Sequence, residues 1–224
     1  MDEEAPDPAI DRRPLASRDT ALAHRVAGWL IDRKVSPNAI SVASVFAGVG
    51  AGAALAATAR WPEHALPLWL VAAVLVQLRL LCNMLDGMVA VGSGQASPVG
   101  ELYNEVPDRL SDAATLVGLG YAAGGAPWLG YTAALTAMLT AYVRAVGKAS
   151  GASNDFRGPM AKPHRMFVVT VTALYVALAP ATWQPRLAGM DLPALALALI
   201  AVGSLHTATR RLLGTARQLR GTRP

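Results

Sequence analysis

The sequence predicts an all-α integral membrane protein, with six transmembrane helices preceded by an interfacial amphipathic helix on the cytoplasmic side. Of its 224 residues, 53% are hydrophobic and 16% are charged, whereas an average soluble domain carries about a quarter charged residues. The apolar residues gather in runs of about 20, the length with which an α-helix crosses a bilayer. This composition excludes a disordered chain, and a single cysteine, Cys82, excludes a disulfide scaffold.

The first predicted element is a basic amphipathic helix within residues 17–34. Its apolar side chains recur at helical spacing, at Leu22, Val26, Trp29 and Leu30. Such a helix directly before a membrane span is typical of one lying in the cytoplasmic interface, and the alternative is an ordinary soluble helix.

The six predicted spans follow in order, at residues 38–59, 66–91, 100–123, 127–148, 164–183 and 190–210. Sixteen of the 20 Lys and Arg residues lie on the side that holds both termini, and two lie on the other side. This asymmetry predicts cytoplasmic termini and explains the net charge of +5 without a nucleic-acid partner. We expect a multi-pass protein of the bacterial inner membrane, divided into an N-terminal segment (1–36), a membrane domain (37–212) and a basic tail (213–224).

Polar residues interrupt the apolar pattern where the second span ends and the third begins. Asn83 and Asp86 are three residues apart and therefore share one helix face. After a short link at 92–99, a second polar stripe steps by four residues: Gly100, Asn104, Asp108 and Asp112. Two antiparallel helices would bring both stripes together as oxygen ligands, which suit Mg²⁺, Mn²⁺ or Ca²⁺.

The spacing of these residues resembles that of a known family. The sequence N-x2-D-G-x2-A-V-x8-G-x3-N-x3-D is similar to the D-x2-D-G-x2-A-R-x8-G-x3-D-x3-D pattern of CDP-alcohol phosphatidyltransferases. Five of the eight fixed letters are kept, and Asn83, Val91 and Asn104 depart from the pattern. Residues 37–41 (PNAIS) resemble the start of that family's first span. Residues 142–145 and 158–165 more loosely resemble its phosphatidylinositol-phosphate-synthase-like members.

The resemblance implies a membrane transferase of phospholipid synthesis that moves a phosphatidyl group from CDP-diacylglycerol to an alcohol acceptor and releases CMP. It also implies one or two Mg²⁺ or Mn²⁺ ions and a homodimer. The implied metal positions are Asn83, Asp86, Asn104 and Asp108, with Asp108 also the base, and the nucleotide would lie beside Asn38, Gly87, Ala90 and Gly100.

A basic cytoplasmic loop offers a site for a phosphorylated acceptor, through Arg144, Lys148, Lys162 and Arg165. Membrane topology alone also explains such a loop. The acceptor stays open among glycerol phosphate, inositol phosphate, serine and a simple polyol.

The two asparagines weaken the implied metal site, because two amides replace two carboxylates. Asp112, Glu101 or Glu105 could supply the missing charge, one ion could suffice, or the site could be impaired. Asp112 could equally pair with Arg79 or Arg109. Two other functions therefore remain: a catalytically impaired family member that binds nucleotide or lipid as a scaffold, and a small six-span transporter.

Overall fold

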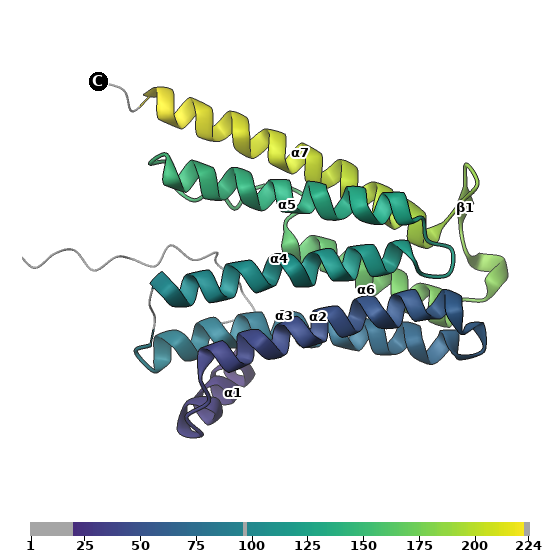
Figure 1. Ribbon diagram of the computed structural model, residues 1–224, viewed down its shortest axis with the longest axis horizontal. Helices are drawn as coiled ribbons and strands as arrows, with labels where there is room; N and C mark the ends of the chain where they lie inside the picture. Colours follow the sequence, from purple (N-terminus) through teal and green to yellow (C-terminus); the bar gives the residue numbers. More distant parts are fainter. Residues whose placement is uncertain (1–19, 96–97, 222–224) are drawn as a thin grey trace, which may run out of the picture.

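The computed structural model describes residues 20–95 and 98–221, with the backbone alone for residues 98–101 and 103–104. Within these residues the chain is all-α except for one two-stranded hairpin (Figure 1). The elements are α1 (Ala21–Asp32), α2 (Pro37–Arg60), η2 (Pro62–His64), α3 (Ala65–Gly92), α4 (Pro98–Gly120), α5 (Pro127–Ala149), α6 (Lys162–Leu178), η3 (Ala181–Trp183), β1 (Arg186–Leu187), β2 (Met190–Asp191) and α7 (Leu192–Gly221).

Helix α1 is the predicted amphipathic helix. Thr20 caps its first turn by accepting a hydrogen bond from the Ala23 backbone N–H at 3.3 Å. Its small buried face packs on α3, where Ala27 joins a cluster with Leu85 and Val89. Leu22 remains exposed on the outer side. The helix therefore lies against the end of α3 that carries the polar motif, and its position at a membrane surface stays a prediction.

Helices occupy the six predicted spans, and the two largest differences from the expected boundaries are at the ends of α6 and α7. Helix α6 ends at Leu178 and not at 183, because Ala179 precedes Pro180 and adopts an extended conformation. Helix α7 continues without a break to Gly221, past the expected boundaries at 210 and 212. Among the described residues, three helical segments are long and apolar enough to cross a membrane: Pro37–Arg60, Pro62–Gly92 and Leu192–Gly221.

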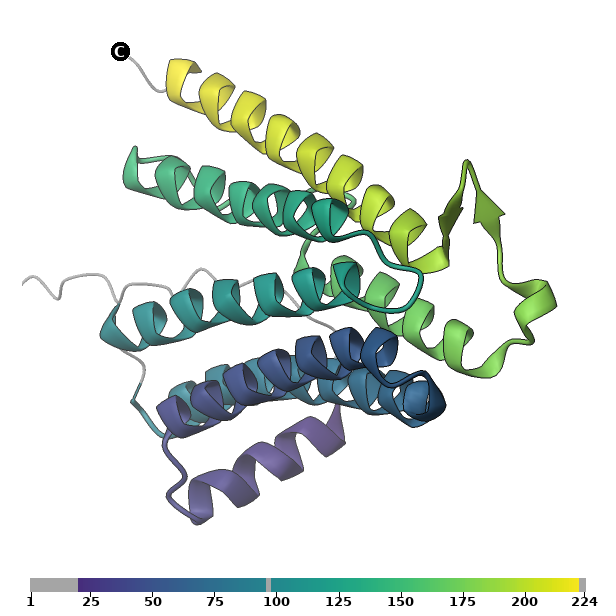
Figure 2. The same cartoon turned by 45° about the vertical axis from the view of Figure 1, so that its right-hand side comes forward.

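The long helices lie side by side in one bundle (Figures 1 and 2). Helix α2 packs on α3 and α4, α5 packs on α4 and α7, and α6 packs on α3 and α7. Small residues permit the close contact of α2 with α4, because a Cβ on Gly52 would overlap the carbonyl of Ala114 and one on Gly118 would overlap Gly52. A Cβ on Gly48 of α2 would likewise overlap Ser111 of α4.

The outer and inner surfaces of the bundle differ in character. Large apolar side chains are exposed on all seven described α-helices, for example Phe46, Val74, Leu135, Phe167 and Val202. Soluble monomers rarely expose apolar surface on this scale, so these faces suit a lipid environment. Charged groups such as Arg79 and Asp112 are instead buried between helices, and these buried charges define the candidate site.

Candidate functional site

The two polar stripes of the sequence motif meet where α3 ends and α4 begins. Asn83 and Asp86 come from α3 and Asp108 comes from α4, and the Asn83 side-chain amide donates a hydrogen bond to Asp108 Oδ1 at 2.5 Å. The structure therefore brings Asn83 and Asp108 into contact, and Asp86 lies three residues further along α3. The side chain of Asn104 and the surroundings of Gly100 lie outside the described residues.

Two serines of α2 hold the α3 stripe in place. Ser41 Oγ donates to Asp86 Oδ2 at 2.7 Å, and Ser44 Oγ donates to Asn83 Oδ1 at 2.5 Å. The α2 residues are three apart, as are Asn83 and Asp86, so two helix faces match turn for turn. Neither serine is among the site residues predicted from the sequence. Their signal was a pair of hydroxyls at helical spacing inside an otherwise apolar span.

Asp108 is surrounded by donors from three helices. Besides Asn83 of α3, Lys162 Nζ at the start of α6 donates to Asp108 Oδ2. The guanidinium groups of Arg79 and Arg109 each lie 3.6 Å from an Asp108 oxygen. The Asp108 side chain nevertheless keeps 10% of its surface exposed, against 5% for Asp112. A residue of the basic loop, 54 positions away in sequence, therefore reaches the predicted catalytic carboxylate.

Asp112 lies one helical turn further along α4 and is held by two arginines, of which Arg79 also lies near Asp108. Arg79 Nη2 donates to Asp112 Oδ1 at 2.6 Å, and Arg165 Nη2 donates to Asp112 Oδ2 at 3.0 Å. Arg165 also donates to the Met160 carbonyl at 2.8 Å. Both guanidinium groups are almost fully buried. The alternative in which Asp112 pairs with Arg79 is therefore the arrangement observed, and Arg165 lies in this buried pair, away from solvent.

The other predicted acceptor residues lie at the same end of the bundle. Arg144 Nη2 donates to Glu105 Oε1 at 2.6 Å, and its guanidinium carbon lies 5.2 Å from the centre of the Phe156 ring. Lys148 is exposed in the last turn of α5. Glu105 is thus paired with Arg144 and also with Arg109, at 3.3 Å.

The residues predicted beside the nucleotide differ in exposure. Asn38 is exposed in the first turn of α2, Gly87 is buried directly after Asp86, and Ala90 is half-buried one turn further along α3. Because residues 87 and 90 are small, they leave space on the surface of α3 beside the carboxylates.

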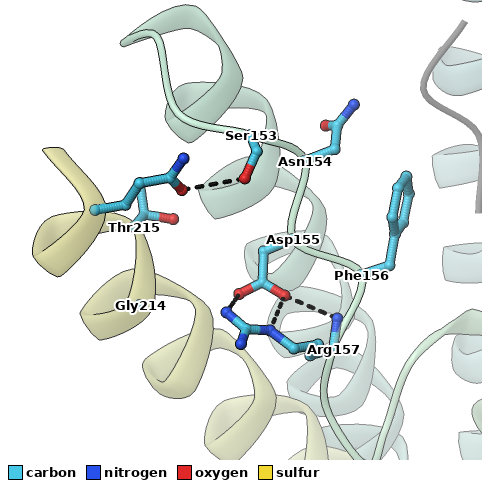
Figure 3. A pocket seen from close by; sticks show the side chains of 8 residues that line it. Ser153, Asn154, Asp155, Phe156, Arg157, Gly214 and Thr215 are labelled. Atoms are coloured by element: carbon cyan, nitrogen blue, oxygen red, sulfur yellow. Dashed lines mark hydrogen bonds and ion pairs between the residues drawn. The ribbon is translucent and has the colours of Figure 1, made fainter. Parts of the chain in front are cut away.

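A hollow of about 400 Å³ lies between the 150–161 loop and α7 (Figure 3). It is lined by Ser153, Asn154, Asp155, Phe156, Arg157, Gly214, Thr215 and Gln218. The hydrogen-bonded guanidinium of Arg157, 2.9 Å from Asp155 Oδ2, holds the pKa of that carboxyl below its usual value. None of the predicted site residues lines this hollow, but Phe156 connects it to Arg144.

The described residues contain no group of three or more His, Cys, Asp and Glu side chains that could hold a metal ion. Among the described residues, two buried side-chain oxygens nevertheless lack a partner, Ser204 Oγ and Asp86 Oδ1. Only Asp86, which is 2% exposed, belongs to the motif. A buried carboxylate oxygen without a donor is costly, and a cation would satisfy it. The structure therefore offers one carboxylate oxygen to a cation, on Asp86.

Comparison with known proteins gives the same picture as the motif. The sequence model of a family described as CDP-alcohol phosphatidyltransferase matches residues 34–208. The phosphatidylinositol phosphate synthase of Corynebacterium glutamicum is 29% identical over 208 residues, which cover 86% of this chain and 83% of that protein. The archaetidylinositol phosphate synthase of Aeropyrum pernix is 29% identical over 159 residues, which cover 67% of this chain and 73% of that protein.

Solved structures show the same fold. The phosphatidylinositol phosphate synthase of Mycobacterium tuberculosis, in complex with manganese and citrate, superposes with a TM-score of 0.71 at 22% identity, covering 89% of this chain and 91% of that one. The same enzyme with CDP-DAG bound gives a TM-score of 0.68 at 23% identity, covering 85% of this chain and 92% of that one.

Proposed function

Because the chain belongs to the CDP-alcohol phosphatidyltransferase family, we propose that it transfers a phosphatidyl group from CDP-diacylglycerol to an alcohol acceptor. One observation carries this proposal. The motif residues Asn83, Asp86 and Asp108 meet in one polar cluster, and Lys162 of the basic loop joins them at Asp108. A lipid-linked donor suits a protein with three helices able to cross a membrane, since its acyl chains stay in the bilayer.

In the proposed reaction, the acceptor hydroxyl attacks the phosphorus that carries diacylglycerol. The new P–O bond forms a phosphodiester, and the phosphoanhydride bond breaks so that CMP leaves. Asp108 takes the proton of the attacking hydroxyl as general base. This role is supported by its small exposed fraction at the edge of the cluster, whereas Asp112 beneath it is held by two arginines.

A divalent ion, Mg²⁺ or Mn²⁺, fits this site at Asp86. The unpartnered Oδ1 atom of Asp86 supports the assignment, and the hard oxygen ligand suits either ion. When bound, the ion would neutralise the diphosphate and stabilise the leaving CMP. We keep Asn104 as a further ligand position from the motif. We leave Asp112 out of the ligand set because both of its oxygens accept from arginine.

The substrates would lie on either side of Asp108. The cytidine nucleotide is assigned to the surface of Asn38, Gly87, Ala90 and Gly100. A phosphorylated acceptor is assigned to Arg144, Lys148 and Lys162, without the buried Arg165. An ammonium carries three N–H donors, so Lys162 can hold Asp108 and a substrate phosphate at the same time.

The proposed cellular arrangement completes this function. We infer six membrane spans, α1 at the cytoplasmic interface, both termini in the cytoplasm, the bacterial inner membrane as the location, and a homodimer. The inference is supported by the six long helices of the described chain and by the charge asymmetry of the sequence.

CMP release by the purified protein tests the proposed function. The protein in detergent is given CDP-diacylglycerol, Mg²⁺ or Mn²⁺, and a panel containing glycerol phosphate, inositol phosphate, serine and a polyol. We expect metal-dependent CMP release that Asp108→Ala abolishes and that Asp191→Asn, in the hairpin at the opposite end, leaves intact. Nucleotide binding without CMP release from any acceptor would instead identify a catalytically impaired binding protein. Ion flux in liposomes that survives Asp108→Ala would identify a transporter.

A further inference from the structure

Asp86 and Asp108 differ in what binds their second oxygen. Asp86 Oδ2 accepts from Ser41 at 2.7 Å, and its Oδ1 is buried without a partner among the described residues. Asp108 accepts from Asn83 at one oxygen and from Lys162 at the other. Asp86 therefore has one buried oxygen available to a metal cation, whereas the Lys162 ammonium already lies on Asp108.

The orientation of the Asn83 amide strengthens this contrast. An ionised carboxylate only accepts hydrogen bonds, so the Asn83 amide nitrogen must face Asp108. Its oxygen then faces Ser44, which donates to it at 2.5 Å. Asn83 in this arrangement offers no negative charge to a second metal ion, and its oxygen already accepts a hydrogen bond from Ser44.

The charges around Asp108 lead to the same conclusion. Asp108 and Asp112 together carry two negative charges, and Arg79, Lys162 and Arg165 all bind one or both of them. A divalent ion at Asp108 would add two positive charges to a group that is already compensated. Like charges in a poorly hydrated site repel strongly, so the balance opposes a second ion there.

We propose that this chain binds a single divalent cation, on Asp86, and that Lys162 takes the electrostatic place of a second ion at Asp108. The inference rests on the proposed function and deepens it by fixing the number of ions. Because the described residues supply no cluster of three acidic, His or Cys ligands, we assign the remaining coordination to Asn104, to water and to the nucleotide phosphates. Mg²⁺ and similar ions commonly bind through one or two carboxylates plus phosphate.

Manganese stoichiometry measured by electron paramagnetic resonance tests this inference on the full-length protein in detergent. With CDP as the nucleotide probe, we expect one Mn²⁺ per chain, and weaker Mn²⁺ binding when CDP is omitted. Asp86→Asn should weaken Mn²⁺ binding more than about 100-fold, since loss of a direct ligand exceeds the 10–100-fold effect of outer-shell changes. The matched control is Glu63→Gln, an exposed carboxylate at the opposite end, which should leave binding unchanged.

A double variant tests the role of Lys162. Asn83→Asp combined with Lys162→Gln adds one negative charge and removes one positive charge, and should raise the stoichiometry to two Mn²⁺ per chain. Arg217→Gln, an exposed cation of α7, should leave it at one. Melting curves of each variant separate loss of the site from loss of the fold.

Several outcomes would overturn the inference. These are two Mn²⁺ per wild-type chain, none with CDP present, one that persists in Asp86→Asn, or a folded double variant that still binds one. The proposed function fails separately: one bound Mn²⁺ with no CMP release would leave the inference standing. CMP release with two bound Mn²⁺ ions would overturn the inference and leave the proposed function standing.

Discussion

Two aspartates on α4, one helical turn apart, have the same chemistry and opposite surroundings. Asp112 is clamped by Arg79 and Arg165, whose guanidinium groups are always charged and fix its geometry through planar donors. Asp108 is held by the flexible ammonium of Lys162 and by the neutral amide of Asn83. Asp112, the inner aspartate, therefore joins α3, α4 and α6. Asp108, the outer aspartate, has partners that a substrate can displace.

The largest expected effect comes from removing the outer carboxylate. Asp108→Asn should lower the rate of CMP release by about 10²–10⁴-fold, the usual contribution of a general base. The change keeps the shape of the side chain, and the rate is read from product formed with CDP-diacylglycerol.

A charge swap sharpens this result. In Asn83→Asp/Asp108→Asn, a carboxylate and an amide still face each other between α3 and α4. The melting temperature of this double variant should therefore be close to that of the wild type. The carboxylate then lies on α3 and no longer at the position assigned to the general base, so the rate of CMP release should stay as low as in Asp108→Asn. Recovery of activity in the swapped protein would refute the assignment of the base to α4.

The second effect concerns stability and the inner aspartate. Asp112→Asn leaves the buried Arg165 guanidinium without its counter-charge and leaves Arg79 with Asp108 alone, at 3.6 Å. Breaking a buried ion pair in this way costs about 3–5 kcal/mol. We expect a markedly lower unfolding midpoint in detergent. The control is Asp191→Asn, which removes an exposed pair with Arg186 and should change the midpoint little. Equal midpoints for the two variants would mean that the inner cluster does not hold the helices together.

Sequence alone predicted the helices well, because apolar runs of about 20 residues are local signals. It also placed Asn83 and Asp86 opposite Asp108, since both stripes follow helical spacing and a short link joins them. The distinct roles of Asp108 and Asp112 were not predictable from that spacing, which treats them alike.

What separates the two aspartates comes from distant parts of the chain. Lys162 and Arg165 reach α4 from the start of α6, and their register depends on how the 150–161 loop folds back. The two α2 serines depend in turn on the rotation of α2 against α3. Such contacts are set by packing, and no local pattern in the sequence encodes them.

The smallest effect is expected in the exposed counterpart of these pairs, Asp155 with Arg157 in the loop that carries Lys162 (Figure 3). Hydrogen bonds from Arg157 lower the pKa of Asp155, so the pair stabilises the loop above the ordinary Asp pKa of about 4. That stabilisation is lost as the pH falls through the lower pKa of the folded state. Hydrogen exchange of residues 153–157 should therefore be unchanged between pH 7 and pH 5 after correction for intrinsic rates, and protection should fall below about pH 4. Asp155→Asn should show the low protection at every pH, and a wild-type loop that loses protection near pH 6 would contradict this assignment.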